Sequence, residues 1–242
     1  MNSIHSKSLK LLSVFFSLIL ALYSEKSLAT HAAGADFTYK SLGGLKYELT
    51  LTFYRDCGGV AEPNTVDFNY RTLTGSYTTV RTVTATKDLT SGQEITSPCT
   101  SAVTKCNGGS YTGIRQWKYK AEVTLPGTAT DWVFSYSLCC RNCAITTINT
   151  PCTNGVSNLY VEATLNNIDG PQNNSPTFSN VPIAFVYIGQ NFNYNHGVLD
   201  EDGDSLVYSL ITPRFNANTN VTWVAPHNTS TPILSSTPFN VN

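Results

Sequence analysis

Residues 46–54 read KYELTLTFY, and this stretch decides the fold class. Large apolar side chains occupy every second position, and more polar ones occupy the positions between them. The first set is Tyr47, Leu49, Leu51 and Phe53, and the second set is Glu48, Thr50, Thr52 and Tyr54. Successive side chains of a strand point to opposite faces of its sheet, so this period of two predicts a half-buried β-strand.

The same alternation recurs in residues 117–125, 131–140 and 159–165. Glycine and proline pairs punctuate the chain between such stretches and favour turns. These pairs are Gly43-Gly44, Gly58-Gly59, Gly108-Gly109 and Pro126-Gly127. Helical periodicity is almost absent. The pattern predicts an all-β chain whose main domain is an antiparallel β-sandwich.

Residues 1–29 have the organisation of a signal peptide. Lys7 and Lys10 precede an apolar run at 11–22, and residues 27–29 offer small side chains at the two positions that a signal peptidase reads. No second long apolar run follows. We therefore expect an exported mature chain, secreted or at the cell surface, with no membrane span of its own.

The chain carries little charge. Charged residues make up 13% of the sequence, the formal net charge is −1, and lysine and arginine form no cluster. This composition argues against nucleic acids and anionic membranes as partners, because both are bound through basic patches.

All seven cysteines fall between positions 57 and 152, which in an exported protein predicts a disulfide-stapled first domain. The disulfide candidates are Cys57, Cys99, Cys106, Cys139, Cys140 and Cys152. Cys143 crowds the adjacent cysteine pair and is expected to be the unpaired thiol. The most local pairing is Cys99 with Cys106.

The alternation of residues 131–140 places Cys139 and Cys140 on opposite faces of a strand, so the two are expected to have different partners. A metal site using Cys140, Cys143 and Cys152 is the alternative. It lacks the second Cys-x-x-Cys pair or nearby histidine that a structural zinc site requires.

Residues 166–176, NNIDGPQNNSP, are polar and aperiodic, and they predict a junction between a sandwich at 30–172 and a second module at 173–242. The second module contains strand-like stretches at 178–188 and 206–211. It is shorter than the roughly 100 residues of an immunoglobulin-like sandwich. We therefore expect an immunoglobulin-like module that is incomplete in this chain.

The acidic side chains after position 175 all fall in residues 200–204, DEDGD. Two carboxylates about 4 Å apart repel by roughly 4 kcal/mol at an effective dielectric constant of about 20, so a folded loop of this kind favours a bound cation. We expect Ca²⁺ bound by Asp200, Asp202 and Asp204, with backbone carbonyls and water completing its shell. The alternative is a solvated turn, and His196 is expected to be a turn residue and not a ligand.

Residues 203–206, GDSL, match the signature of a lipase and esterase family. A catalytic serine needs a positioned base, and no Asp-x-x-His element that would supply one occurs in the chain. We therefore expect no enzymatic activity.

Two sets of residues carry a resemblance to a known family. The first comprises residues 30–39 (THAAGADFTY), 47–57 (YELTLTFYRDC) and 139–142 (CCRN), and the second comprises 194–197 (YNHG) and 200–206 (DEDGDSL). The first set resembles the N-terminal region of large Bacteroidetes cell-surface proteins, called gliding-motility-associated or PKD-domain-containing. The second set resembles the cadherin-like or PKD-like module that follows in those proteins.

This resemblance implies a multidomain surface protein, exported by the Sec route and then by the type IX system. We expect a non-catalytic structural and adhesive role with a calcium-rigidified junction. The expected partners are neighbouring domains of a longer protein, surface glycans or other cells. The alternative is a carbohydrate-binding or accessory region of a secreted hydrolase, with Trp117 and Trp132 as a sugar-stacking platform, although their alternation favours a place in the core.

Overall fold

The computed structural model describes residues 32–96, 101–149, 158–182, 185–186, 188–190 and 193–234. The expected signal peptide, Cys99 and Cys152 lie outside these ranges. Within them, helix is limited to the 3-10 turns η1 (Gly75–Tyr77) and η2 (Lys105–Asn107), and no helix is long and apolar enough to cross a membrane. The strands are β1 (Ala32–Gly43), β2 (Lys46–Asp56), β3 (Thr65–Thr72), β4 (Arg81–Glu94), β5 (Ile114–Thr124), β6 (Trp132–Leu138), β7 (Leu159–Leu165), β8 (Thr177–Phe178), β9 (Val198–Leu199), β10 (Arg214–Asn216) and β11 (Thr219–Asn220).

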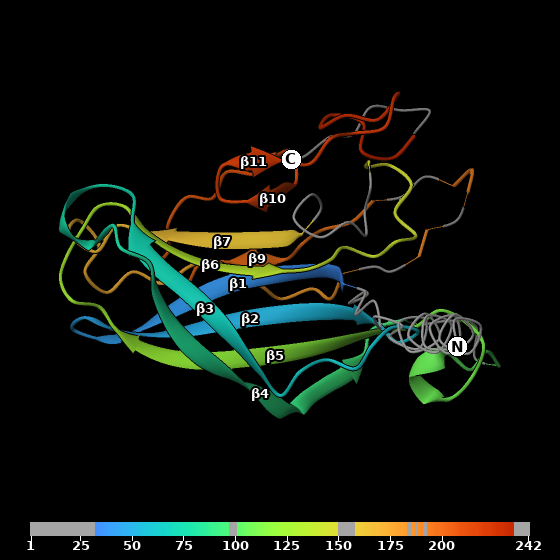
Figure 1. Ribbon diagram of the computed structural model, residues 1–242, viewed down its shortest axis with the longest axis horizontal. Coiled ribbons are helices and arrows are strands. Elements are labelled where there is room, and N and C mark those ends of the chain that lie inside the picture. The colour runs from blue at the N-terminus through green and yellow to red at the C-terminus, as the bar shows by residue number, and fades with distance from the viewer. Residues whose placement is uncertain are drawn as a thin grey trace, which may run out of the picture.

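Seven of these strands form one antiparallel sheet in the order β1-β2-β5-β4-β3-β6-β7 (Figure 1). The first half of β4 pairs with β3, and its second half pairs with β5 beyond a register shift between Asp88 and Gln93. Gly92 lies in this shift, where a Cβ atom would collide with the Trp117 ring. The bend lets the sheet fold over on itself as two layers, which confirms the predicted all-β sandwich.

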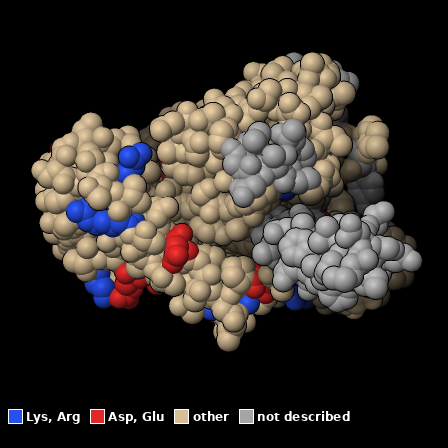
Figure 2. All heavy atoms as spheres, viewed as in Figure 1, with Lys and Arg blue, Asp and Glu red and all other residues tan. Residues whose placement is uncertain are grey.

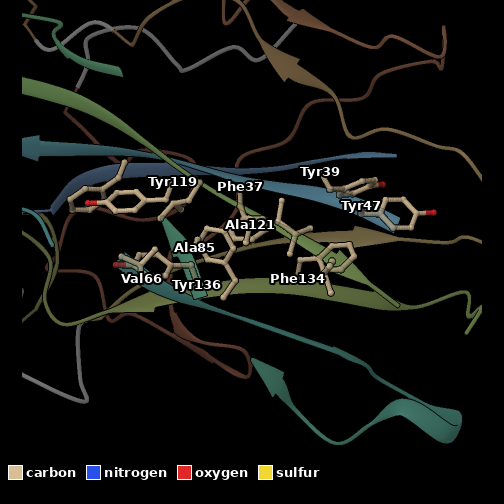
Figure 3. Close-up of a cluster of buried hydrophobic side chains, with 14 of the residues drawn as sticks. Phe37, Tyr39, Tyr47, Val66, Ala85, Tyr119, Ala121, Phe134 and Tyr136 are labelled. Carbon is tan, nitrogen blue, oxygen red and sulfur yellow. The ribbon is translucent and has the colours of Figure 1, made fainter. Parts of the chain in front are cut away.

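A single aromatic-rich core fills the space between the layers (Figure 3). The apolar positions of β2 that the sequence pattern singled out are all buried, as are Trp132, Phe134 and Tyr136 of β6. Phe37 and Phe68 meet edge to face at 4.9 Å between ring centroids. Such pairs add to the hydrophobic gain of burial. The alternation therefore identified the buried face of these strands correctly.

The two edge strands of the sheet, β1 and β7, come together on closing the sandwich. They do not pair as a ladder, and the Tyr39 hydroxyl donates across the gap to the carbonyl of Thr164 at 3.1 Å. At the start of β1, the Asn142 amide donates to the Ala32 carbonyl at 3.2 Å. Non-strand segments therefore satisfy part of the β1 edge.

The other half of the β1 edge is covered by the predicted junction. Ser175 hydroxyl oxygen accepts from the Tyr39 amide at 2.8 Å, and the Ser175 amide donates to the Tyr39 carbonyl at 3.0 Å. Two residues further along β1, the Ser41 amide donates to Asn174 Oδ1 at 2.8 Å. These residues satisfy part of the hydrogen bonding that a free edge strand would expose to water or to other chains.

Beyond the junction, regular structure is sparse. Strands β8 and β9 form one two-stranded sheet, and β10 and β11 form another. Residues 206–211 are not a strand, and the prediction of one there is wrong. Their apolar side chains have no partner strand or core to pack against among the described residues, since Val207 and Ile211 are largely exposed. An immunoglobulin-like module at 173–242 stays a prediction.

Cys57 and Cys106 form a disulfide with a Cα–Cα distance of 4.9 Å. The predicted pairing of Cys106 with Cys99 is therefore wrong. Register explains the difference: β2 and β5 pair through to their ends, and the Cys57 amide donates to the Gly113 carbonyl at 2.8 Å. This contact brings the loop that contains η2 back over the end of β2.

Cys139 and Cys140 are bonded to each other, so the expectation of separate partners is wrong. Strand β6 ends at Leu138, and the alternation that would have separated them ends with it. Cys143 is also disulfide-bonded, so its prediction as the unpaired thiol is wrong as well. Since Cys140 and Cys143 are oxidised, neither can supply a thiolate to a metal.

The Cys57–Cys106 bond closes a loop with a sequence separation of 49 residues. Replacing both cysteines with serine is expected to lower the free energy of unfolding by about 4 kcal/mol, because the unfolded chain regains the loop's freedom. Urea denaturation of the variant against the oxidised protein measures this loss. A non-reduced digest that links Cys106 to any other cysteine would contradict the assignment.

Candidate functional site

The acidic loop at 200–204 is organised by its own first residue. Asp200 Oδ1 accepts hydrogen bonds from the amides of Asp202 at 3.0 Å and Asp204 at 3.1 Å. Gly203 has a φ of +81°, a left-handed conformation that glycine adopts without steric cost. The loop is therefore a turn in which one carboxylate replaces the missing backbone acceptors.

The next acidic residues tie this loop to the sandwich. Asp202 Oδ2 accepts from the Asn174 amide at 2.6 Å, and its Oδ1 accepts from Asn174 Nδ2 at 3.0 Å. Glu201 forms an ion pair with Lys40 of β1 at 2.7 Å, with both side chains about half exposed. Asn174 also accepts from Ser41, so these contacts join the acidic loop, the junction and the edge of β1. We call this set of contacts the latch; it is formed by Lys40, Ser41, Asn174, Glu201 and Asp202.

The predicted calcium ligands do not converge in this arrangement. In the described ranges, no group of three or more His, Cys, Asp or Glu side chains could hold a metal ion. Oxygens of Asp200 and Asp202 already accept N–H groups, whereas calcium needs six to eight oxygens facing one point. The residues as placed do not fit the ion, and calcium binding by Asp200, Asp202 and Asp204 stays a prediction.

Two alanine substitutions separate the latch from a calcium site. Asp202→Ala removes both acceptors for Asn174, so we expect the Tm to fall by about 2 °C or more, equally in calcium and in chelator. Asp204 contributes its backbone amide to the loop, so Asp204→Ala is expected to leave the Tm unchanged. Thermal melts with each variant test this. A calcium-dependent rise in wild-type Tm that both variants abolish would favour the calcium site instead.

A polar groove lies beside the latch, between the outer face of the sheet and residues 177–181. Its volume is about 210 Å³. The sheet contributes the floor and residues 177–181 contribute one wall. The lining residues are Asp36, Thr38, Thr50, Thr52, Tyr54, Gln116, Lys118, Thr177, Phe178, Ser179, Asn180 and Val181.

Strand register explains why the floor is polar. The residues that alternate with the core positions of β1, β2 and β5 point to the other face of the sheet. Asp36, Thr52 and Lys118 stand in one cross-strand row, and Tyr54 and Gln116 stand in the next. Cross-strand neighbours lie about 5 Å apart, so the polar groups form a closely spaced array on a rigid surface.

Asp36 and Tyr54 form the centre of the floor. The Tyr54 hydroxyl donates to Asp36 Oδ2 at 2.7 Å. Burial raises the pKa of Asp36 above its usual value of 3.8, against the opposing effects of the Tyr54 hydrogen bond and of His196. Burial and Asp36 together raise the pKa of Tyr54, which keeps its hydroxyl protonated as a donor.

The wall is held in place by residues 194–197. The Ser179 amide donates to the Gly197 carbonyl at 2.9 Å, and Asn180 Nδ2 donates to the Asn195 carbonyl at 2.8 Å. Gly197 has a φ of +60°, and a Cβ atom there would collide with the side chains of Ser179 and Asn180. The His196 ring packs against Tyr194 and Phe178.

The remaining residues that the sequence singled out are not brought together into a site. Ser205 follows the acidic loop in a segment without helix or strand, unlike the strand-to-helix turn of an esterase serine. Trp132 is fully buried, and Trp117 lies beneath the ammonium group of Lys87, 4.7 Å from its ring centroid. Neither tryptophan forms a flat exposed platform.

Charged side chains are few and scattered over the face of the molecule shown in Figure 2. Comparison with protein-family models, with curated proteins and with solved structures finds no match to this chain.

Replacing Asp36 with asparagine is expected to change the pH dependence of stability. The folded-state pKa of Asp36 is raised, so its carboxyl binds more protons in the folded than in the unfolded state, and stability falls as pH rises through this window. Asp36→Asn keeps an acceptor for Tyr54 and cannot ionise. We expect its free energy of unfolding, relative to wild type, to increase between about pH 3 and about pH 7.

Asp67→Asn is the matched control, because Asp67 is an exposed β3 carboxylate that accepts from the Thr84 hydroxyl at 2.8 Å. Denaturant titrations at each pH give the comparison. A constant difference between Asp36→Asn and wild type across this range would contradict the assigned burial of the carboxylate.

Proposed function

We propose that the chain acts outside the cell as a non-catalytic structural and adhesive protein. The observation that carries this proposal is the Cys57–Cys106 disulfide, which ties the end of β2 to the loop that contains η2. Structural disulfides persist in oxidising, extracytoplasmic environments. The signal-peptide pattern of residues 1–29 and the weakly charged composition point the same way.

The proposal of a non-catalytic role rests on the sequence and the local structure around Ser205, the serine of the GDSL segment. Ser205 lies in a segment without helix or strand, and the chain contains no Asp-x-x-His element to supply a base. A nucleophile without a positioned base is not activated. The proposed work of the protein is therefore contact and spacing.

The latch gives the structural half of this role. Asp202, Asn174 and Ser41 form a continuous hydrogen-bonded chain from the acidic loop to the edge of β1, and Glu201 adds an ion pair with Lys40. Contacts of this kind restrict rotation of the segment that follows the sandwich. We propose that they set the direction in which neighbouring domains of a longer surface protein extend, with surface glycans or other cells as the external partners.

Bead attachment under flow tests the proposal. Microspheres coated with the oxidised mature chain are expected to attach to immobilised polysaccharides or to whole bacterial cells, and beads coated with reduced and alkylated chain are expected to detach. The reduced sample is the control, because it has the same sequence without the disulfide bonds. Failure of oxidised beads to attach to any surface, or hydrolysis of ester or glycoside substrates by the pure chain, would contradict the proposal.

A further inference from the structure

We propose that the polar groove over β1, β2 and β5 is a binding site for one unit of a neutral saccharide. The inference rests on the proposed adhesive function and names the ligand class through which contact is made. It is carried by the floor residues Asp36, Thr52 and Tyr54 and by the wall at 177–181.

The lining of the groove is predominantly polar. Hydroxyl and amide groups predominate, and the charged members are one carboxylate, Asp36, and one ammonium group, Lys118. The site is therefore close to neutral overall and offers both donors and acceptors. Sugar hydroxyls both donate and accept, so they complement such a set, whereas a strongly charged ligand would find only one group of opposite sign.

The polar side chains of the groove floor are closely spaced and stand on paired strands. Asp36 faces Thr52 across β1 and β2, and Thr38 faces Thr50 in the adjacent row. Opposite side chains on one face of a sheet lie about 5 Å apart. A ring that carries several hydroxyls can contact two rows at once. The paired strands hold those rows in place, which lowers the entropic cost of binding.

The Asp36 carboxylate has one oxygen engaged by Tyr54. Tyr54 occupies Oδ2, which leaves Oδ1 to accept from a ligand. A half-buried carboxylate gains from a second donor, because hydrogen bonds to an ionised acceptor are stronger than neutral ones and offset the loss of water. A ligand hydroxyl supplies that donor without adding charge to the groove.

The wall of the groove also has an apolar part. Phe178 and Val181 line the groove, and each is about half exposed despite its size. Sugar rings have C–H-rich faces that pack against aromatic side chains, so Phe178 offers the apolar contact that complements the polar floor. The His196 ring packs edge to face against Phe178, with 6.2 Å between ring centroids.

Size and position limit the ligand further. The groove of about 210 Å³ is smaller than the roughly 300–1,000 Å³ of pockets that enclose drug-sized ligands, which suits a single sugar ring at the end or side of a longer chain. An extended peptide would bind by adding a strand to a free edge. The β1 edge next to the groove is already covered by Asn174 and Ser175, which disfavours that mode.

The test uses the oxidised mature chain on an array of neutral oligosaccharides, followed by titration calorimetry with the oligosaccharide that gives the strongest signal. Thr52→Val replaces a hydroxyl with a methyl group of the same shape and keeps the strand-favouring branched side chain. Thr52→Val and Asp36→Asn are each expected to weaken binding at least about tenfold, the effect of roughly 1.4 kcal/mol.

Matched controls come from a second hydroxyl and carboxylate pair on the outer face of the sheet. Thr84 donates to Asp67 at 2.8 Å between β4 and β3, and neither residue lines the groove. Thr84→Val and Asp67→Asn are therefore expected to change affinity by less than about twofold. Melting curves of all four variants confirm that loss of binding is not loss of fold.

Three results would overturn the inference. In the first, coated beads attach to a surface but the chain binds no glycan on the array. In the second, the chain binds a glycan and both groove variants bind it equally well. In the third, the chain binds members of a peptide library and no glycan. The first of these leaves the adhesive function standing and removes only its ligand. If beads attach to nothing and no glycan binds, the proposed function and the saccharide site both fail.

Discussion

The structure depends on how the free edge of β1 is closed. A seven-stranded sheet that folds into a sandwich still has two edge strands, and their unpaired amides and carbonyls must find partners. In this protein, β1 and β7 approach each other without pairing, and Ser175 supplies a donor and an acceptor to Tyr39. Residues beyond β7 therefore supply part of the hydrogen bonding at the β1 edge of the sandwich.

The groove and the latch both follow from this closure. Since Asn174 and Ser175 are fixed on the β1 edge, the chain that follows must cross the outer face of the sheet at residues 177–181. That crossing turns an exposed polar sheet face into a walled groove. The acidic loop at 200–204 then returns to the same edge, where it binds Asn174 and Lys40, so one structural constraint places both candidate functional features side by side.

Local periodicity in the sequence predicted which faces of the strands are buried. It did not predict contacts between residues that lie far apart in the chain. The alternation predicted the buried faces of β2 and β6. Strand β4 has few large apolar residues and consists largely of threonine and charged residues, so it shows no such pattern. The partner of Cys106 depends on strand register. Likewise, nothing near Asp202 in sequence reveals Asn174, 28 residues earlier, as a hydrogen-bond partner of its carboxylate.

Amide hydrogen exchange followed by NMR tests the edge closure most directly. The amides of Tyr39 and Ser41 face away from β2 and donate to Ser175 and Asn174, so they are expected to exchange slowly in the native protein. Ser175→Gly is expected to speed the exchange of Tyr39 while amides within the β2–β5 ladder stay protected. Rapid exchange of both edge amides in the unmodified protein would contradict the account.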